Sequence, residues 1–452
     1  MIDIKNKKIY FAGKGDQLSY EELEKFLLQN NVKFVASIKE SELIIEGGLT
    51  PLHIQDKIFT ATQNGAKKIN IEEFEKFYSD SFSVNSTLMA TKLTKDNNRL
   101  VKLLQNKYFS NDVFIKILKQ YDFKNTPLYD TDESRDVCRA IVNRFCTLVK
   151  RNHNIQYAPI GIYYTALETF NSDLLDIIYN MPEYSISDRT AKDNQPLSLK
   201  EVVALNPNSS LHIQIEILNN NIQEELIYLA SNNNLSKKIK EELKNKNKNN
   251  INIALLKSQN FLFDDFDEVL QNEELKVAFL KYFIFTQNIF NDLLKNNLSN
   301  IDIIYLSSNE FLDENMINEL EKLNIDNSIV ALLKHKNISN DLITKYLKIN
   351  DKIYNISLSH NIKLTNKQYI KLYNLDDLDV NISLASNKQI DSKLIQELYK
   401  SNNRMIHKTL CLNTSTPLNI LMQLQLDNEL KLLVKENITY QKFAEKMLGF
   451  SG

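Results

Sequence analysis

The sequence predicts a small parallel α/β domain followed by a large all-α array of repeated two-helix units. Short apolar runs that end at glycines alternate with capped helical patterns over the first eighty residues. A segment ending in Leu-Ala-Ser-Asn occurs at Leu229–Asn232 and again at Leu384–Asn387, with looser copies elsewhere. Helix-capping Ser, Thr or Asp residues recur at spacings of about 22–28 residues. This period is typical of an α-solenoid, whose units bury their apolar faces by stacking.

The composition of the chain limits the classes of function that it can have. The chain has 452 residues, of which 43% are hydrophobic and 25% charged, as in an ordinary folded protein. A net charge of −2 indicates no global attraction to nucleic acid or to an anionic membrane. Three scattered cysteines predict neither a disulfide framework nor a zinc site. The first ten residues lack a signal-peptide core, and the most apolar windows are about half the ~20 residues that span a bilayer. We therefore expect a cytoplasmic protein with no membrane association.

The first domain is expected at residues 1–79. Its strands are predicted at Ile9–Phe11, Phe34–Val35, Leu43–Ile45 and Lys67–Asn70. Its helices are predicted to begin at Ser19 with Glu22, at Thr50 with Pro51, and at Asn70 with Glu73. The order β-α-β-β-α-β-α predicts a four-stranded parallel sheet flanked by helices.

Several residues of this domain carry a family resemblance. They are Phe11-Ala12-Gly13 after the first strand, Leu43–Gly48 at the third, Lys57 and Ala61 in the second helix, and Phe74 where the family usually has Trp. Through them the domain resembles a BRCT domain, a phosphopeptide- or DNA-end-binding module common in replication and repair proteins.

The resemblance implies a phosphate pocket at Gly13, Lys14 and Lys57. Phosphate-binding members of the family place Ser or Thr just before the glycine, whereas this chain has Ala12, so one hydroxyl donor is missing. The alternative is that Lys57 is an ordinary solvated lysine on a helix.

The rest of the chain divides by the regularity of its pattern. Residues 80–96 are polar and aperiodic, which predicts a linker. Residues 97–200 predict irregular helical repeats, interrupted by a longer helix at about Asp132–Arg151 and by loops at Tyr157–Gly161 and Pro182–Pro196. Residues 201–452 predict the regular α-solenoid.

The regular repeats are defined by the start of each second helix. The expected caps are Ser210, Ser236, Asp264, Thr286, Asp313, Ser339, Thr365, Asp391, Thr416 and Thr439. In the last seven units an apolar residue follows four positions after the cap, and six of those units have an apolar staple residue just before it, as Leu312 stands before Asp313. An asparagine such as Asn232 or Asn387 is expected to close the first helix in a left-handed conformation.

The units look like leucine-rich-variant and HEAT-like repeats, because Leu205–Ser209 is close to the Leu-x-Asn-Pro-Asn turn of the former. The iron–sulphur module of that family needs a cysteine cluster that this chain lacks, so no cofactor is expected.

One helix concentrates arginine. Only seven residues of the chain are Arg, and four of them are Arg135, Arg139, Arg144 and Arg151. On a continuous helix Arg135, Arg139 and Lys150 share one edge, and a guanidinium suits phosphate or carboxylate. The sequence thus predicts contacts with nucleic acid or with an acidic partner. The alternative is that the arginines pair with the acidic residues at the start of the helix (Asp130, Asp132, Glu133 and Asp136) or are simply solvated.

No catalytic motif is present, and the six histidines are isolated in the sequence. We therefore expect a non-catalytic scaffold that binds partner proteins with its BRCT-like head and with the concave face of its solenoid. The alternative is a DNA-associated repair or replication factor that grips the phosphate backbone through Arg135–Arg151 and the head. An enzyme of the HEAT-like DNA glycosylase kind is a further alternative.

Overall fold

The computed structural model describes residues 4–15, 20–81, 97–123, 128–150, 152–157, 160–183 and 197–447. The chain divides into two compact units, Met1–Ile213 and Gln214–Gly452, and each is described by itself. The expected boundaries at residues 79, 96 and 200 all lie in the first unit and stay predictions. Within the described residues, no helix has the length and hydrophobicity needed to cross a membrane.

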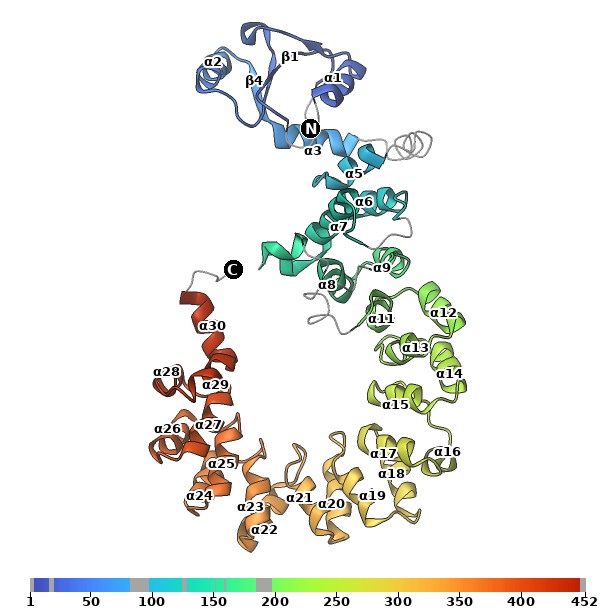
Figure 1. The fold of residues 1–452 in the computed structure, drawn as a ribbon, viewed down its shortest axis with the longest axis vertical. Helices are drawn as coiled ribbons and strands as arrows, with labels where there is room; N and C mark the ends of the chain where they lie inside the picture. The colour runs from blue at the N-terminus through green and yellow to red at the C-terminus, as the bar shows by residue number, and fades with distance from the viewer. Residues whose placement is uncertain are drawn as a thin grey trace. The chain divides into compact units, whose positions relative to one another are not determined.

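The head is a small α/β domain, as predicted (Figure 1). Four parallel strands lie in the order β2-β1-β3-β4. The strands are β1 (Lys8–Ala12), β2 (Lys33–Phe34), β3 (Leu43–Glu46) and β4 (Lys67–Asn70), and the helices are α1 (Tyr20–Gln29), η1 (Ile38–Glu40), α2 (Leu52–Gln63) and α3 (Ile71–Ser81). The predicted Ser19–Glu22 cap and the linker after Ser81 lie outside the residues or side chains that the structure describes.

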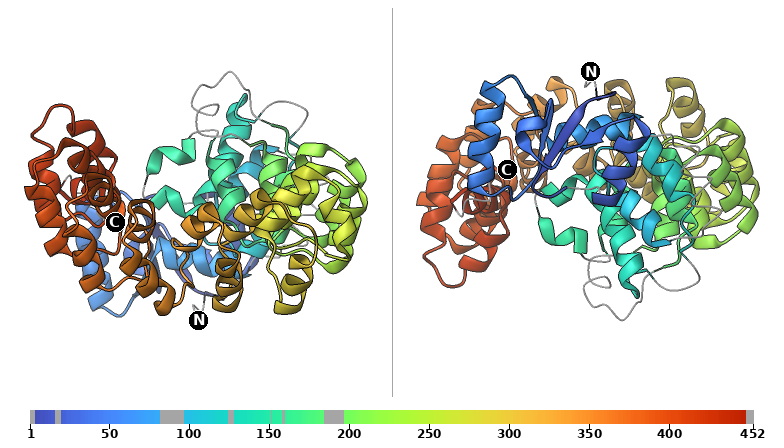
Figure 2. Two further views of the ribbon diagram at one scale, coloured as in Figure 1. Left: turned by 90° about the horizontal axis from the view of Figure 1, so that it is seen from below. Right: turned by 90° about the horizontal axis from the view of Figure 1, so that it is seen from above.

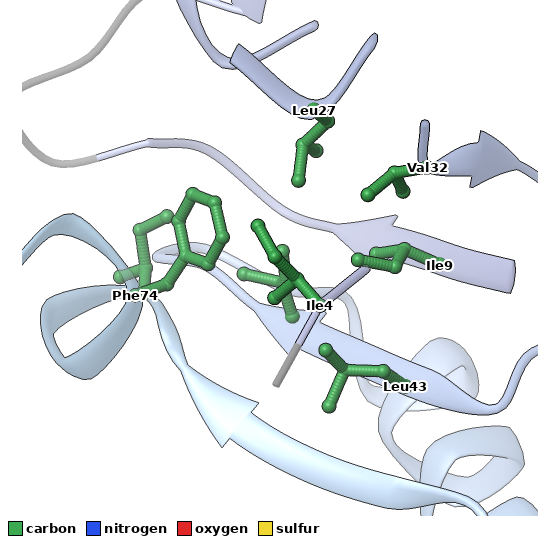
Figure 3. Packing of buried hydrophobic residues seen from close by; sticks show 8 residues of the cluster. Ile4, Ile9, Leu27, Val32, Leu43 and Phe74 are labelled. Carbon is green, nitrogen blue, oxygen red and sulfur yellow. The ribbon is translucent and has the colours of Figure 1, made fainter. Parts of the chain in front are cut away.

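Alternating side chains of the strands build two apolar layers, because successive residues of a strand point to opposite faces. Ile9 and Leu43 pack with Leu27, Val32 and Phe74 on one face (Figure 3). A second cluster packs on the other face, where Ala12 and Ile44 meet Ile58 of α2.

The remainder of the first unit is helical but irregular. Its helices are α5 (Asn97–Gln105), α6 (Asn111–Leu118), α7 (Asp132–Phe145), η2 (Thr147–Lys150), η3 (His153–Tyr157), α8 (Ile160–Glu168), α9 (Ser172–Tyr179), α11 (Leu199–Leu205) and the start of α12 (Leu211–Asn220).

The long helix predicted at Asp132–Arg151 is wrong, because α7 ends at Phe145. Cys146 is extended, and the backbone N–H of Thr147 donates to the Glu168 carboxylate at 3.0 Å instead of continuing the helix. Lys150 therefore lies in η2, a separate element from the α7 arginines.

The second unit is a succession of helical pairs (Figures 1 and 2). The first helices of the pairs are α13 (Gln223–Ala230), α15 (Asn249–Lys257), α17 (Glu273–Tyr282), α19 (Asn300–Ser307), α21 (Asp326–Leu332), α23 (Lys352–Ser359), α25 (Leu378–Ser386), α27 (Arg404–Leu412) and α29 (Lys431–Glu436). The second helices are α14 (Lys237–Asn245), α16 (Phe266–Leu270), α18 (Gln287–Leu294), α20 (Glu314–Lys322), α22 (Asn340–Ile349), α24 (Asn366–Tyr373), α26 (Ser392–Lys400), α28 (Leu418–Leu424) and α30 (Ile438–Met447). Each first helix packs against the next first helix, from α13 to α29. The predicted helical-repeat architecture is confirmed at this level.

Most of the predicted caps are confirmed. The side chains of Ser210, Ser236, Thr286, Asp313, Ser339, Thr365 and Asp391 accept a hydrogen bond from a first-turn N–H. Three caps differ. Asp265 rather than Asp264 caps α16, the buried Thr416 donates to the Leu410 carbonyl, and Thr439 lies inside α30. Phe290, Ile317, Ile343, Tyr369, Ile395 and Ile420, each placed four residues after a predicted cap, are buried as expected, whereas the predicted staple residue Ile438 is exposed.

Candidate protein-interaction surface

A buried asparagine ends most of the first helices and shapes the turn that follows. In the pair formed by α25 and α26, Asn387 is extended, and its Oδ1 accepts the backbone N–H of Gln389 at 2.9 Å. The same contact recurs at Asn232, Asn309, Asn361, Asn413 and Asn437. The left-handed conformation predicted for Asn387 is therefore wrong, because the side chain rather than a positive φ closes this turn.

The amide nitrogen of the same asparagines joins neighbouring pairs. Asn387 Nδ2 donates to the carbonyl oxygens of Ser359 and Asn361, at 2.8 and 3.2 Å. Equivalent bonds run from Asn260 to Ala230 and Asn232, from Asn309 to Leu280 and Phe283, from Asn361 to Leu333 and His335, from Asn413 to Ala385 and Asn387, and from Asn437 to Cys411 and Asn413. We call these residues, with His335, the asparagine ladder. The ladder satisfies carbonyls at helix ends that have no partner within the helix.

At three places in the array a residue other than asparagine occupies or replaces a ladder position. His335 takes the place of asparagine at the end of α21. Phe283 ends α17, where its ring packs with Phe263, Phe279 and Phe285. After α29, Gln441 Nε2 donates to the Lys435 carbonyl at 2.9 Å, the oxygen that a further ladder residue would use.

Left-handed asparagines do occur, but at the ends of the second helices. Asn221, Asn247, Asn324, Asn350 and Asn402 have φ between 50° and 55°. Asparagine tolerates this conformation better than other residues with a Cβ. The array therefore uses asparagine in two distinct ways, once for its backbone and once for its side chain.

Because the ladder holds successive first helices in register, their first turns lie along a common edge. Several exposed large apolar side chains lie in these first turns, in the loops that precede them, or at the C-terminal ends of the second helices that lead into those loops. The apolar edge, as we call it, consists of Leu323, Ile349, Ile353, Leu378, Met405, Leu426 and Leu432. Ile353, Leu426 and Leu432 have exposed fractions of 60%, 84% and 68%. Exposed apolar groups that recur in this way along one edge are typical of binding surfaces.

Ion pairs tie the first turns to one another beside these apolar residues. Lys352 of α23 contacts Asp377 and Asp379 of the next pair at 3.1 and 2.6 Å. Hydrogen bonds to these two carboxylates raise the pKa of Lys352. Ile353 follows Lys352 in the sequence, and Leu378 lies between the two aspartates, so both exposed apolar residues belong to the turns that this ion pair joins.

A second link has the same form. Arg404 of α27 contacts Asp427 at 2.8 Å and Glu429 at 2.5 Å. The hydrogen bond from Arg404, supported by backbone N–H groups, lowers the pKa of Asp427 to about 2. Each link thus holds one cation between two carboxylates and leaves an excess of negative charge.

The edge is acidic as a whole. From α21 to α29, the loops that precede the first helices and the first turns of those helices carry seven carboxylates and three cations. The carboxylates are Asp326, Asp351, Asp376, Asp377, Asp379, Asp427 and Glu429, and the cations are Lys352, Arg404 and Lys431. Lys322 and Lys400, at the ends of second helices, pair with Glu319 and Glu397 of their own helices, and Lys348 adds one further cation. The apolar edge therefore lies in a negative field.

The arginines of α7 do not form one free row. Arg135 donates to the Tyr129 carbonyl at 2.6 Å and contacts Asp132 at 3.2 Å, and Arg139 pairs with Asp136 beneath the ring of Tyr157. These are the acidic partners considered from the sequence. Lys150 lies beyond the end of α7, and Arg151 lies outside the described residues.

Arg144 has a structural role that the sequence did not indicate. Its guanidinium donates to the carbonyls of Phe109 and Asn106 at 2.6 and 2.8 Å and lies over the ring of Phe114. Burial lowers its pKa from the usual value. Arg144 therefore joins α7 to the turn after α5 much as the ladder asparagines join later pairs.

The head places the residues of the predicted phosphate pocket in different surroundings. Gly13 has φ +81°, and a Cβ there would lie 2.5 Å from Thr50 Oγ1. The backbone of Lys14 is paired in both directions with Gly48, at 2.8 Å. Lys57 lines a groove of about 770 Å³ between α2 and the Ala36–Ser41 segment, together with Tyr10 and Lys39, whereas Gly13 and Lys14 are not among its lining residues.

Sequence reasoning missed the apolar edge. A signal was present, because Ile301, Ile353 and Met405 recur at every second 26-residue step, each as the second residue of a first helix. No protein-family model, curated protein or solved structure matches this chain, so the site rests on its own geometry.

Proposed function

We propose that this chain is a non-catalytic scaffold whose array of helical pairs is an α-solenoid and binds a protein partner along the apolar edge. The single observation that supports this proposal most is the row of exposed apolar side chains held in register by the ladder. The partner segment that fits is basic and carries apolar anchors, because the edge presents apolar side chains within a negative field.

The edge is suited to binding because its backbone is already ordered. Ladder bonds join the C-terminal ends of successive first helices and ion pairs join their first turns before any partner arrives, so less conformational entropy is lost on association. Packed helices lie roughly 8–10 Å apart, and seven residues of an α-helix rise about 10.5 Å. A partner helix lying along the edge would therefore meet successive pairs with apolar residues spaced about seven apart.

The head is proposed as a BRCT-like second module. The strand order β2-β1-β3-β4 and the placement of α2 on the face opposite Phe74 support this fold. Ala12, and the absence of Gly13 and Lys14 from the lining of the groove that Lys57 lines, make the head a weaker candidate for phosphate than the edge is for a basic segment.

The test compares two peptides with the full chain in a fluorescence-anisotropy titration. One is a 21-residue amphipathic helix of Leu and Lys, and the other has Glu in place of every Lys. We expect the Leu/Lys peptide to bind and the Leu/Glu peptide not to bind. The variant Ile353→Ser/Leu378→Ser/Met405→Ser/Leu432→Ser should weaken binding at least tenfold, which is about 1.4 kcal/mol.

The matched control is Ile370→Ser/Met422→Ser, which removes two apolar side chains that are each 47% exposed on second helices. This variant should bind as the unchanged chain does, and circular dichroism should show that both variants remain folded. Equal losses in the two variants, or equal binding of both peptides, would contradict the proposal.

The DNA-associated alternative has a separate test. Steep salt dependence of duplex binding, lost in Arg135→Ala/Arg139→Ala, would favour backbone phosphate contacts. The aspartate partners of both arginines predict weak binding instead. Absence of duplex binding at low salt would remove this alternative.

A further inference from the structure

His335 replaces asparagine in the ladder and reproduces both of its hydrogen bonds. Its Nε2 lies 3.0 Å from the Asn309 carbonyl, and its Nδ1 lies 3.1 Å from the backbone nitrogen of Asn337. A carbonyl oxygen can only accept and a backbone N–H can only donate. The ring must therefore be neutral, with its proton on Nε2 and a lone pair on Nδ1.

We propose that His335 makes the joint between α19 and α21 acid-labile. Protonation of Nδ1 places its N–H opposite the backbone N–H of Asn337, and two donors cannot form a hydrogen bond with each other. The imidazolium can still donate from Nε2 to Asn309, but the contact with Asn337 that forms the turn is lost. The side chain is 7% exposed, so water cannot readily take over the role of the lost acceptor. The other ladder residues of the described array are asparagines, whose side-chain amides neither gain nor lose a proton in this pH range.

The surroundings of the ring favour the neutral form. Burial lowers the pKa of His335 and is the largest effect. The hydrogen bond with the Asn309 backbone acts in the opposite direction, the neighbouring Lys336 lowers the pKa further, and Glu310, from the segment after α19, raises it. The ladder neighbours Asn309 and Asn361 carry no charge. Lys334 lies on the same segment, and His360, at the end of α23, has its own pKa lowered by burial and by Lys334.

The direction of the effect follows from linkage. Above a pH of about 6.5, the ordinary histidine pKa, the imidazole is neutral in both the closed and the opened joint. Below that pH the opened joint binds a proton that the closed joint does not. Opening is therefore favoured by up to tenfold per pH unit, until the pH reaches the lowered pKa of the closed state.

The experiment is hydrogen exchange of the full chain, read as protection factors for peptides within 333–340 and, for comparison, 385–392 and 411–418, which contain the ladder residues Asn387 and Asn413 and no histidine. Protection of the 333–340 segment should fall by up to about fivefold between pH 6.5 and 5.5, while the two asparagine-based segments keep theirs. The variant His335→Asn installs the residue found elsewhere in the ladder and should abolish this loss. His360→Asn is the matched control and should leave the loss in place.

A second measurement needs no variant. The nitrogen chemical shifts of His335 should show protonated Nε2 and unprotonated Nδ1 at pH 7.5. Pyrrole-type Nδ1 at that pH, constant protection of 333–340 down to pH 5.5, or an equal loss in His335→Asn would each overturn the proposal. The inference does not depend on the partner of the apolar edge, so failure of the peptide test leaves it standing.

Discussion

The hydrogen bonds of Asn387 allow the loss of stability in an Asn387→Ala variant to be predicted. Its Nδ2 donates to Ser359 O and Asn361 O at 2.8 and 3.2 Å, and its Oδ1 accepts from the N–H of Gln389 at 2.9 Å. In Asn387→Ala, Asn361 O keeps the hydroxyl of Tyr369 at 2.6 Å, but Ser359 O and the Gln389 N–H lose these partners. The buried Ser359 O loses its partner, which costs about 1–3 kcal/mol, whereas the N–H of the exposed Gln389 can turn to water. We therefore expect a loss of about 1–3 kcal/mol.

The assay is urea denaturation of the full chain followed by circular dichroism at 222 nm. Long repeat arrays need not unfold in one step, so hydrogen exchange in α23–α26 should accompany it to locate the loss. Asn387→Asp keeps the acceptor but turns a second oxygen toward two carbonyls, and it should destabilise at least as much as Ala.

The control is Asn366→Ala, on the exposed face of α24, where a side-chain contact with Asp391 is solvated. It should change stability by no more than about 0.5 kcal/mol. If Asn387→Ala costs no more than Asn366→Ala, the ladder does not stabilise the array and the reasoning is refuted.

Three other perturbations test separate features. Asn402, at φ 53°, should accept Gly with little loss, whereas Asn402→Val should cost about 1–2 kcal/mol in urea denaturation because a β-branched residue opposes positive φ. Gly13→Ala should lower the melting temperature, since its Cβ would meet Thr50 Oγ1 at 2.5 Å and Gly48 O at 2.6 Å; an unchanged melting temperature would contradict this. The pKa of Asp427 is lowered to about 2, so its ion pair with Arg404 should stabilise the folded array above pH ~4 and lose this effect as the pH falls toward 2. The measurement is an NMR titration of the Asp427 carboxyl, and a midpoint near pH ~4 would contradict the prediction.

Local signals explain what the sequence predicted well. A strand such as β3 is a buried apolar run stopped by glycine, and a cap such as Ser339 acts within its own first turn. Both depend on residues a few positions apart. The order of the head and the phase of the second helices were therefore predictable.

Contacts between distant residues explain what was missed. The end of α7 depends on Glu168, which is 21 residues from Thr147. The role of Asn387 depends on carbonyls 26 and 28 residues away, so its local pattern indicated only a turn-forming residue. The apolar edge could not be assigned because exposure depends on which face of each first helix stacks on its neighbour.

The ladder also bears on how the length of this protein can change. Between Asn361 and Asn413 each unit offers the same two carbonyl acceptors to the unit after it and places the same amide against the unit before it. Units with identical connectors are interchangeable, so duplication or excision of 26 residues in phase would rejoin matching ends. This stretch is therefore a modular segment that can lengthen or shorten by whole units.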